Sequence, residues 1–179
     1  HDISKLETVL NVAKTKETCC LVHMKTKKGM GYQYALDNPE LYHSVSPFDI
    51  DRGVRAEKNA SFTSVFGEIL CNQASIDLKI CAVTAAMCGG SGLSDFRDRF
   101  PDRFFDVGIA EEHAITFCGG LSLNGLIPVC AIYSTFAQRV YDQLLHDISI
   151  QKASIILALS HCGLVAGDGI THQGIFDCS

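Results

Sequence analysis

Residues 104–133 read FFDVGIAEEHAITFCGGLSLNGLIPVCAIY, and this stretch decides the fold. It begins with a short apolar run at 104–107, continues with a helical pattern at 110–123 and returns to a wholly apolar run at 127–133. Short apolar strands that alternate with helices are typical of a parallel sheet covered by helices on both faces. The stretch therefore predicts a strand, helix and strand of an α/β fold.

The same alternation extends on both sides of this stretch. We expect further strands at 80–84 and 154–160, and helices at 93–100 and 135–150. A stripe of Phe62, Val65, Phe66, Ile69 and Leu70 after Ser61 predicts one more helix, the first of the second domain. Because ligands of parallel sheets bind outside the carboxyl ends of the strands, chemistry is expected in the loops 108–112, 134–139 and 161–174.

The first 58 residues have a different character. Apolar residues at helical spacing over 3–13, with Asp2 as N-cap, predict a helix, and the apolar run 19–24 predicts a strand after it. Residues 25–59 lose this periodicity and contain charges, glycines and prolines, as expected of a long connection between domains. We therefore place a domain boundary near residue 58.

Composition narrows the class of protein. The 179 residues are 47% hydrophobic and carry a formal net charge of -5, which suits a globular protein without a basic nucleic-acid-binding face. Apolar runs such as 155–159 are far shorter than the ~18 residues of a membrane-spanning helix. We expect neither nucleic acid nor membrane as a partner. Because the chain does not begin with Met, we also expect it to be part of a longer protein.

Cysteine usage points to a reducing compartment. The nine cysteines are odd in number and contain no Cys-x-x-Cys pair, so neither a disulfide framework nor a zinc site is predicted. Those that fall in apolar runs are expected to be buried free thiols. They are Cys20, Cys71, Cys81, Cys118 and Cys130.

Each expected loop carries polar residues with two interpretations. Glu111 and Glu112 start a helix, where acids complement the helix dipole, yet one of them could be a catalytic carboxylate. Helical rotation allows only one of the two to face a crevice squarely. In the next loop Phe136 could be a packing residue and Arg139 a solvated surface charge, yet such a polar, aromatic and cationic mixture is unusual at the start of a core-facing helix and also suits a binding site. The glycine-rich 163–174 suits a close approach to a ligand or a plain turn.

Taken together, these motifs give a specific family resemblance that covers the whole chain. The sequence resembles the 1-deoxy-D-xylulose-5-phosphate synthases, thiamine-diphosphate enzymes of the transketolase class. The matching segments are GIAEEHA at 108–114, AIYSTF at 131–136 with QR at 138–139, YDQ at 141–143 with HD at 146–147, and DG at 168–169 with THQG at 171–174. Upstream matches are TKKG at 26–29, YH at 42–43 and RFPDR at 99–103.

The resemblance implies a reaction, cofactors and a domain plan. Pyruvate and glyceraldehyde 3-phosphate would be condensed, with loss of carbon dioxide, to a precursor of isoprenoids, thiamine and pyridoxal phosphate. Residues 1–25 would be the tail of the diphosphate-binding domain, 26–58 the linker and 59–179 the pyrimidine-binding domain. The motif for Mg²⁺ and diphosphate is not matched, so no metal ligand is expected within this chain. The remaining diphosphate-binding and C-terminal domains, a homodimer and a cytoplasmic location are implied.

Residue roles follow from the same resemblance. Catalytic roles are implied for Glu111, His43 and His172. Cofactor contacts are implied for Lys28, Ile109, Glu111 and Phe136. Substrate contacts are implied for Tyr133, Arg139, Asp168, His172 and His161. His161 stands where the family usually has Arg, which keeps its charge when a histidine is only partly charged.

Two other interpretations remain open from sequence. One is the pyrimidine domain of a 2-oxo-acid dehydrogenase β subunit, which shares the sheet and the glutamate but would not normally carry the 133–139 and 168–174 segments in this form. The other is a non-catalytic α/β binding module. Such a module would have no physical reason to retain Glu111, Phe136 and His172 together. If the resemblance to the synthases holds, the chain alone is expected to be inactive, because the magnesium and diphosphate motif and the C-terminal domain are not matched.

Overall fold

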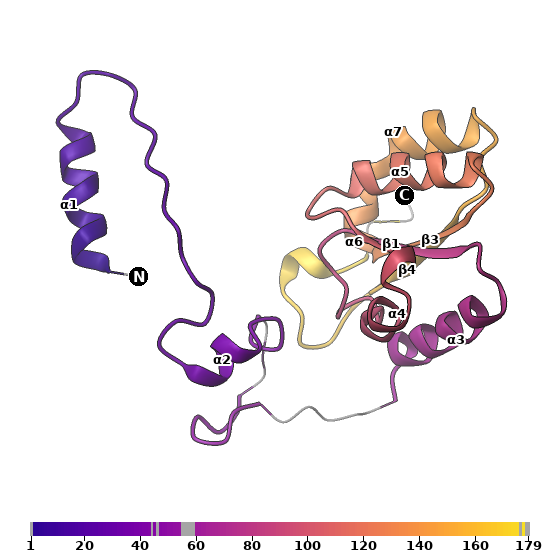
Figure 1. Ribbon diagram of the computed structural model, residues 1–179, viewed down its shortest axis with the longest axis horizontal. Coiled ribbons are helices and arrows are strands. Elements are labelled where there is room, and N and C mark those ends of the chain that lie inside the picture. The colour runs from indigo at the N-terminus through magenta and orange to yellow at the C-terminus, as the bar shows by residue number, and fades with distance from the viewer. Residues whose placement is uncertain (1, 44, 46, 55–59, 176, 178–179) are drawn as a thin grey trace. The chain divides into compact units, whose positions relative to one another are not determined.

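A computed structural model describes residues 2–43, 45, 47–54, 60–175 and 177. The chain divides into two compact units, His1–Lys58 and Asn59–Ser179, which are described separately (Figure 1). No helix in the described part of the chain is long and apolar enough to cross a membrane.

The first unit begins with helix α1 (Ile3–Lys14). Asp2 caps it, since its Oδ1 accepts a hydrogen bond from the Lys5 amide at 3.0 Å. The strand predicted at 19–24 is wrong: these residues are irregular, and an isolated apolar run without a paired neighbour cannot form a sheet. Cys20, expected to be buried, is exposed for the same reason.

The connection 25–54 is locally ordered around aromatic rings. A short helix α2 (Gln33–Asp37) lies within it. Tyr32 contacts the rings of Tyr34, Tyr42 and Phe48 at centroid distances of 5.4, 5.5 and 6.1 Å. The Tyr32 hydroxyl donates to the Ile50 carbonyl at 2.7 Å. This segment is thus more than a spacer, although its sequence has no periodicity.

The second unit is built on four parallel strands in the order β2-β1-β3-β4. They are β1 (Ile80–Thr84), β2 (Phe104–Asp106), β3 (Ile127–Tyr133) and β4 (Ile156–Ser160). In register, Ala82 lies opposite Val129 and Ala131 opposite Ala158. The predicted fold class is confirmed, and strands 80–84 and 127–133 begin and end as expected. The fourth strand starts two residues later than expected.

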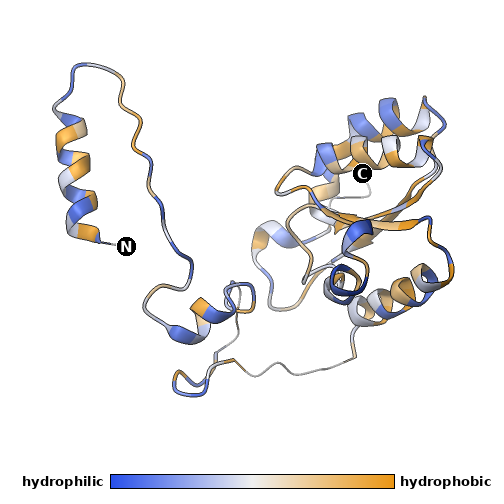
Figure 2. Cartoon of the chain, viewed as in Figure 1, coloured by the Kyte–Doolittle hydropathy of each residue, from blue (hydrophilic) through white to orange (hydrophobic). Residues whose placement is uncertain are grey.

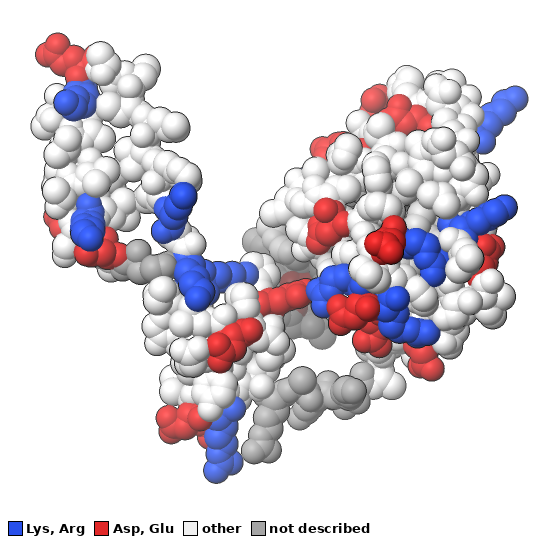
Figure 3. Space-filling view, viewed as in Figure 1, with Lys and Arg blue, Asp and Glu red and all other residues white. Residues whose placement is uncertain are grey.

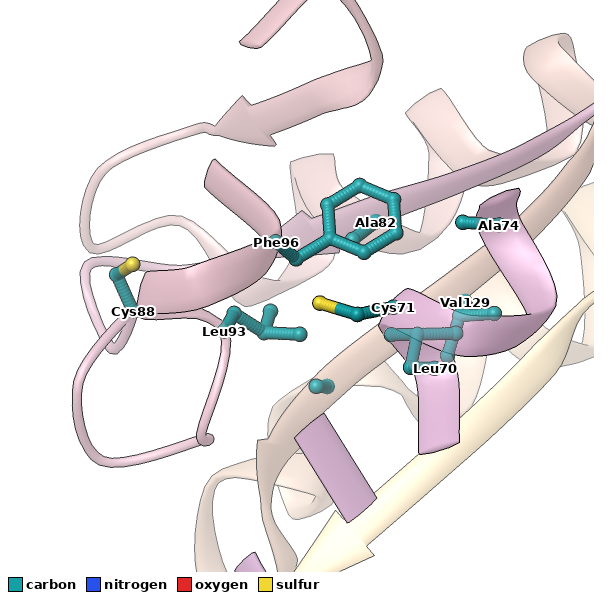
Figure 4. Close-up of a cluster of buried hydrophobic side chains, with 9 residues drawn as sticks. Leu70, Cys71, Ala74, Ala82, Cys88, Leu93, Phe96 and Val129 are labelled. Atoms are coloured by element: carbon teal, nitrogen blue, oxygen red, sulfur yellow. The ribbon is translucent and has the colours of Figure 1, made fainter. Parts of the chain in front are cut away.

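Helices cover both faces of this sheet (Figure 1). On one face lie α3 (Phe62–Ile76) and α4 (Ser94–Arg99), followed by the 3-10 turn η1 (Pro101–Arg103). On the other lie α5 (Glu111–Leu123) and α7 (Tyr141–Gln143). Two cores result, one under each helical layer. Figure 4 shows the α3 side, where Leu93 and Phe96 lie near Leu70 and Cys71.

Helix α3 buries only part of its apolar stripe, namely Leu70 and, partly, Phe66. Ser61 does begin the helix, in a capping box with Ser64. However, Phe62 is 98% exposed, and Val65 and Ile69 are also exposed. The buried side consists of Gly67, Leu70, Cys71 and Ala74. A Cβ on Gly67 would collide with the Gly92 carbonyl, so the loop before α4 lies directly on the helix backbone. This close contact favours small residues on the buried side of α3. Apolar bands remain on the outer surface (Figure 2).

The helix predicted over 135–150 is broken into four pieces. They are α6 (Ser134–Ala137), the 3-10 turn η2 (Gln138–Val140), α7 and a π-helical segment, η3 (Leu144–Ser149). A π-turn holds an extra residue and often occurs beside functional sites. The breaks let Ser134, Ala137, Val140 and Leu144 reach the core while other side chains of the segment face the loops.

Candidate functional site

The carboxyl ends of the four strands meet at one edge, as parallel pairing requires. Asp106, at the end of β2, ties two of the loops there. Its Oδ1 accepts from the Ala86 amide at 2.8 Å and from the Gly108 amide at 3.0 Å. Sequence reasoning missed this residue, although an acid directly after an apolar strand was a usable signal. The loop between β2 and α5 is therefore tied to the loop after β1.

Glu111 is the first residue of α5 and is only 3% exposed. Its neighbour Glu112 is exposed. The expectation that at most one of Glu111 and Glu112 turns inward thus agrees with their burial, since only Glu111 is buried. A buried carboxylate needs a compensating partner, which at a helix start is partly provided by the dipole.

The partner of Glu111 is Arg139. Arg139 Nη1 donates to Glu111 Oε1 at 2.9 Å, and the guanidinium carbon lies 5.1 Å from the centre of the Phe136 ring. The arginine side chain is 49% exposed, so it joins a buried carboxylate to the loop surface. A charge-assisted bond of this kind orients the carboxylate through one oxygen and leaves the second oxygen outside the bond.

Four rings converge beside this pair. Tyr133 and Phe136 stack at 5.9 Å with an interplanar angle of 3°. His161 stacks against Tyr133 at 3.7 Å, and His172 meets the Phe136 ring edge-on at 5.3 Å. A Cβ on Gly90 would collide with the Tyr133 hydroxyl, so this glycine lets the phenol approach the loop after β1. The structure thus unites residues from the loops after β1, β3 and β4.

The Tyr133 phenol is held neutral. Burial raises the pKa of Tyr133, and the nearby Asp168 carboxylate raises this pKa further. Tyr133 is therefore a hydrogen-bond donor throughout the neutral range.

His161 has an unusual backbone. Its φ of 58° lies in the left-handed region, which costs a residue with a Cβ about 1 kcal/mol. Its Nδ1 lies 3.3 Å from Ser160 Oγ. This backbone conformation, and not only the residue type, sets the ring against Tyr133.

Asp168 and His172 lie on the segment 162–174. Gly163 and Gly174 close its base with reciprocal backbone bonds of 3.0 and 2.8 Å. The 3-10 turn η4 (Ile170–His172) carries His172. Ile109, expected to contact a cofactor, is 84% exposed in the loop before α5 and is accessible to such a contact.

Lys28 and His43 belong to the first unit and contact each other there. Lys28 Nζ lies 2.5 Å from His43 Nδ1. Because an ammonium group can only donate, Nδ1 accepts and the imidazole hydrogen lies on Nε2. His43 is thus set to present an N–H donor.

The side chains in and around this site suit an aromatic heterocycle as ligand. A carboxylate can bond a ring nitrogen, while Phe136 offers a face for stacking and Ile109 an apolar contact. In the described ranges no group of three or more His, Cys, Asp or Glu side chains is placed to hold a metal ion. On the visible face of the second unit, charges of both signs are mixed (Figure 3).

Comparison with known proteins agrees with this geometry. Residues 58–179 match the family model of the transketolase pyrimidine-binding domain. The chain is 52% identical to 1-deoxy-D-xylulose-5-phosphate synthase of Clostridium perfringens (strain 13 / Type A) and 50% identical to that of Aquifex aeolicus (strain VF5). Both matches cover 100% of this chain but 29% of the relative, so the chain spans less than a third of their length.

Two solved transketolase structures also resemble this chain. A split-gene transketolase, described as an inactive beta4 tetramer, is 32% identical with a TM-score of 0.53, and the match covers 63% of this chain and 36% of that one. Transketolase from Campylobacter jejuni is 17% identical with a TM-score of 0.57, over 94% of this chain and 25% of that one, which supports the fold.

Proposed function

The chain belongs to the family of transketolase pyrimidine-binding domains, and we propose that the protein carrying it is a 1-deoxy-D-xylulose-5-phosphate synthase. That enzyme would join pyruvate to glyceraldehyde 3-phosphate and release carbon dioxide. Identity near 50% over the whole chain supports this choice within the family. The observation that carries the thiamine-dependent chemistry is Glu111, a buried carboxylate at a helix start that is paired with Arg139, whose guanidinium lies over the Phe136 ring.

The residues present fit the pyrimidine half of thiamine diphosphate. When bound, this cofactor would supply a nucleophilic carbon and an electron sink for decarboxylation. Glu111 would hold a proton at the aminopyrimidine nitrogen, with Arg139 fixing its orientation. Phe136 would stack on the ring, and Ile109 would exclude water from its edge.

Substrate contacts would come from the rim of the same site. Tyr133, held neutral, would donate a hydrogen bond, and His172 would relay a proton. Asp168 would accept from a substrate hydroxyl, while Arg139 and His161 would face the phosphate. In the first unit, Lys28 would bind a diphosphate oxygen and His43 would donate from Nε2 to the reacting pyruvate.

The complete protein would contain the domains and the magnesium site of the synthase that this chain does not match. Magnesium and its ligands, the rest of the diphosphate-binding domain and the C-terminal domain would lie outside these residues. A homodimer in the cytosol is the assembly that we propose.

The test is the full-length protein supplied with thiamine diphosphate, Mg²⁺, pyruvate and glyceraldehyde 3-phosphate. Product formation by mass spectrometry is expected, and Glu111→Gln should lower kcat about 100-fold or more, since an amide cannot exchange the proton. Glu112→Gln is the matched control, because its side chain is exposed. Equal losses in both variants would favour a mere helix-capping role for Glu111, and transfer of acetyl to lipoamide instead would indicate a 2-oxo-acid dehydrogenase.

A further inference from the structure

The family resemblance implies no catalytic or binding role for Gln173, which lies in the segment THQG at 171–174. Its side-chain amide nevertheless forms hydrogen bonds with four backbone groups. Its Oε1 accepts from the Val165 amide at 2.7 Å. Its Nε2 lies 3.1 Å from the Val165 carbonyl, 3.3 Å from that of Asp168 and 3.2 Å from that of Gly169. Since an amide has two N–H donors, the three carbonyls share them.

These bonds close residues 165–169 into a ring around one side chain. The segment contains Gly167, whose φ of 82° is in the left-handed region, and it has little regular structure of its own. Backbone groups that lack secondary structure need other partners. The half-buried amide of Gln173 supplies them.

The segment so closed carries or adjoins two side chains of the site. Asp168 lies within it, close enough to Tyr133 to raise the pKa of the phenol. His172 precedes Gln173 directly and meets the Phe136 ring edge-on. A change in the shape of 165–169 would therefore move both side chains relative to the rings.

We propose that Gln173 is a positioning residue, whose amide holds residues 165–169 in the shape that sets Asp168 and His172 against Tyr133 and Phe136. It acts on the substrate pocket through those two side chains, so the inference rests on the proposed function. Among side chains of this length only an amide offers both an acceptor and two donors. Glutamate would turn a carboxylate toward three carbonyl oxygens, and alanine would remove all four bonds and leave the Val165 amide and the Asp168 carbonyl to water.

The experiment compares Gln173→Ala and Gln173→Glu with the wild type in the full-length protein. Gln151→Glu is the control, because it makes the same charge change at an exposed position. In Gln173→Ala, amide hydrogen exchange over 165–172 should be about tenfold faster, and kcat/KM should fall about 10- to 100-fold. The control should match the wild type in both measurements.

A pH profile separates positioning from general damage. The carboxyl group introduced by Gln173→Glu can donate one hydrogen bond while it is protonated, but none once it is ionised. The three carbonyl oxygens that face the introduced carboxyl disfavour its ionised form and should raise its pKa above the usual value of about 4.3. The activity of Gln173→Glu relative to Gln173→Ala should therefore fall as the pH rises from about 4.5 to 7. Both variants retain Asp168, His172 and Tyr133, so the ratio cancels the titration of these groups.

Two results would overturn the proposal. One is unchanged exchange over 165–172 in Gln173→Ala, and the other is a pH-independent ratio between the two variants. If the wild-type protein makes no 1-deoxy-D-xylulose 5-phosphate, the proposed function fails, but the exchange measurement still decides whether Gln173 holds the segment.

Discussion

Replacing Arg103 with methionine should loosen the junction between α3 and β1 by about 3 kcal/mol. Arg103 Nη1 donates to the Asp77 carbonyl at 3.2 Å and the Ile80 carbonyl at 2.9 Å, and Nη2 donates to the Ala74 carbonyl at 3.0 Å. Ala74 lies in the last turn of α3, whose carbonyls have no helical partner. The positive charge also complements the helix dipole.

The magnitude follows from these contacts. A hydrogen bond to a charged group is worth about 1.5–3 kcal/mol, and the contact with the Phe100 ring at 4.6 Å adds about 0.5–1 kcal/mol. The side chain is only half-buried, so water can replace most of the three bonds, and a net loss of one such bond plus the ring contact gives about 3 kcal/mol. Lysine cannot span carbonyls on both sides, so Arg103→Lys should cost about 1–2 kcal/mol.

Amide hydrogen exchange in α3 and β1 of the full-length protein measures this directly. A loss of about 3 kcal/mol corresponds to exchange about 100-fold faster in these elements. Arg99→Met is the control: Arg99 lies 5.1 Å from the same Phe100 ring but is exposed, with a bond to Ser75 at 3.0 Å, and should cost under about 1 kcal/mol. An equal effect of the two substitutions would show that the backbone carbonyls do not depend on Arg103.

Two further predictions concern thiols and the phosphate. Burial raises the pKa of the Cys71 and Cys81 thiols, so both should react with an aromatic disulfide far more slowly than exposed Cys162. Because the folded state binds these protons more tightly, the stabilisation is complete below the unfolded thiol pKa of about 8.5 and is lost as the pH rises above it. Faster reaction above that pH is expected, and equal rates for all three thiols at neutral pH would contradict it. Separately, His161→Arg should lower the KM for glyceraldehyde 3-phosphate severalfold while the pyruvate KM stays constant, because arginine is always charged; an unchanged phosphate-substrate KM would place residue 161 outside the phosphate site.

The amino-acid sequence by itself determined the fold class and the ends of the central strands. The runs 80–84 and 127–133 are apolar throughout because both faces of a central parallel strand are covered, and that requirement is written in adjacent residues. The helix starts at Ser61 and Glu111 were also predictable from adjacent residues, because capping and helix-dipole effects act within one turn. Helical rotation predicted that at most one of Glu111 and Glu112 turns inward.

Tertiary structure alone decided which apolar face of α3 is buried and which polar groups meet. Periodicity shows that a helix has an apolar stripe, but the close approach of the Gly92 loop to Gly67 buries the side that holds Gly67 and Leu70. Phe62 and Ile69, at the other edge of the stripe, remain exposed. Likewise, Glu111 and Arg139 are 28 residues apart, and the ring of bonds around Gln173 depends on the path of a loop. Local sequence encodes what a segment needs to bury or bond; only the packing of distant segments determines the partner that it receives.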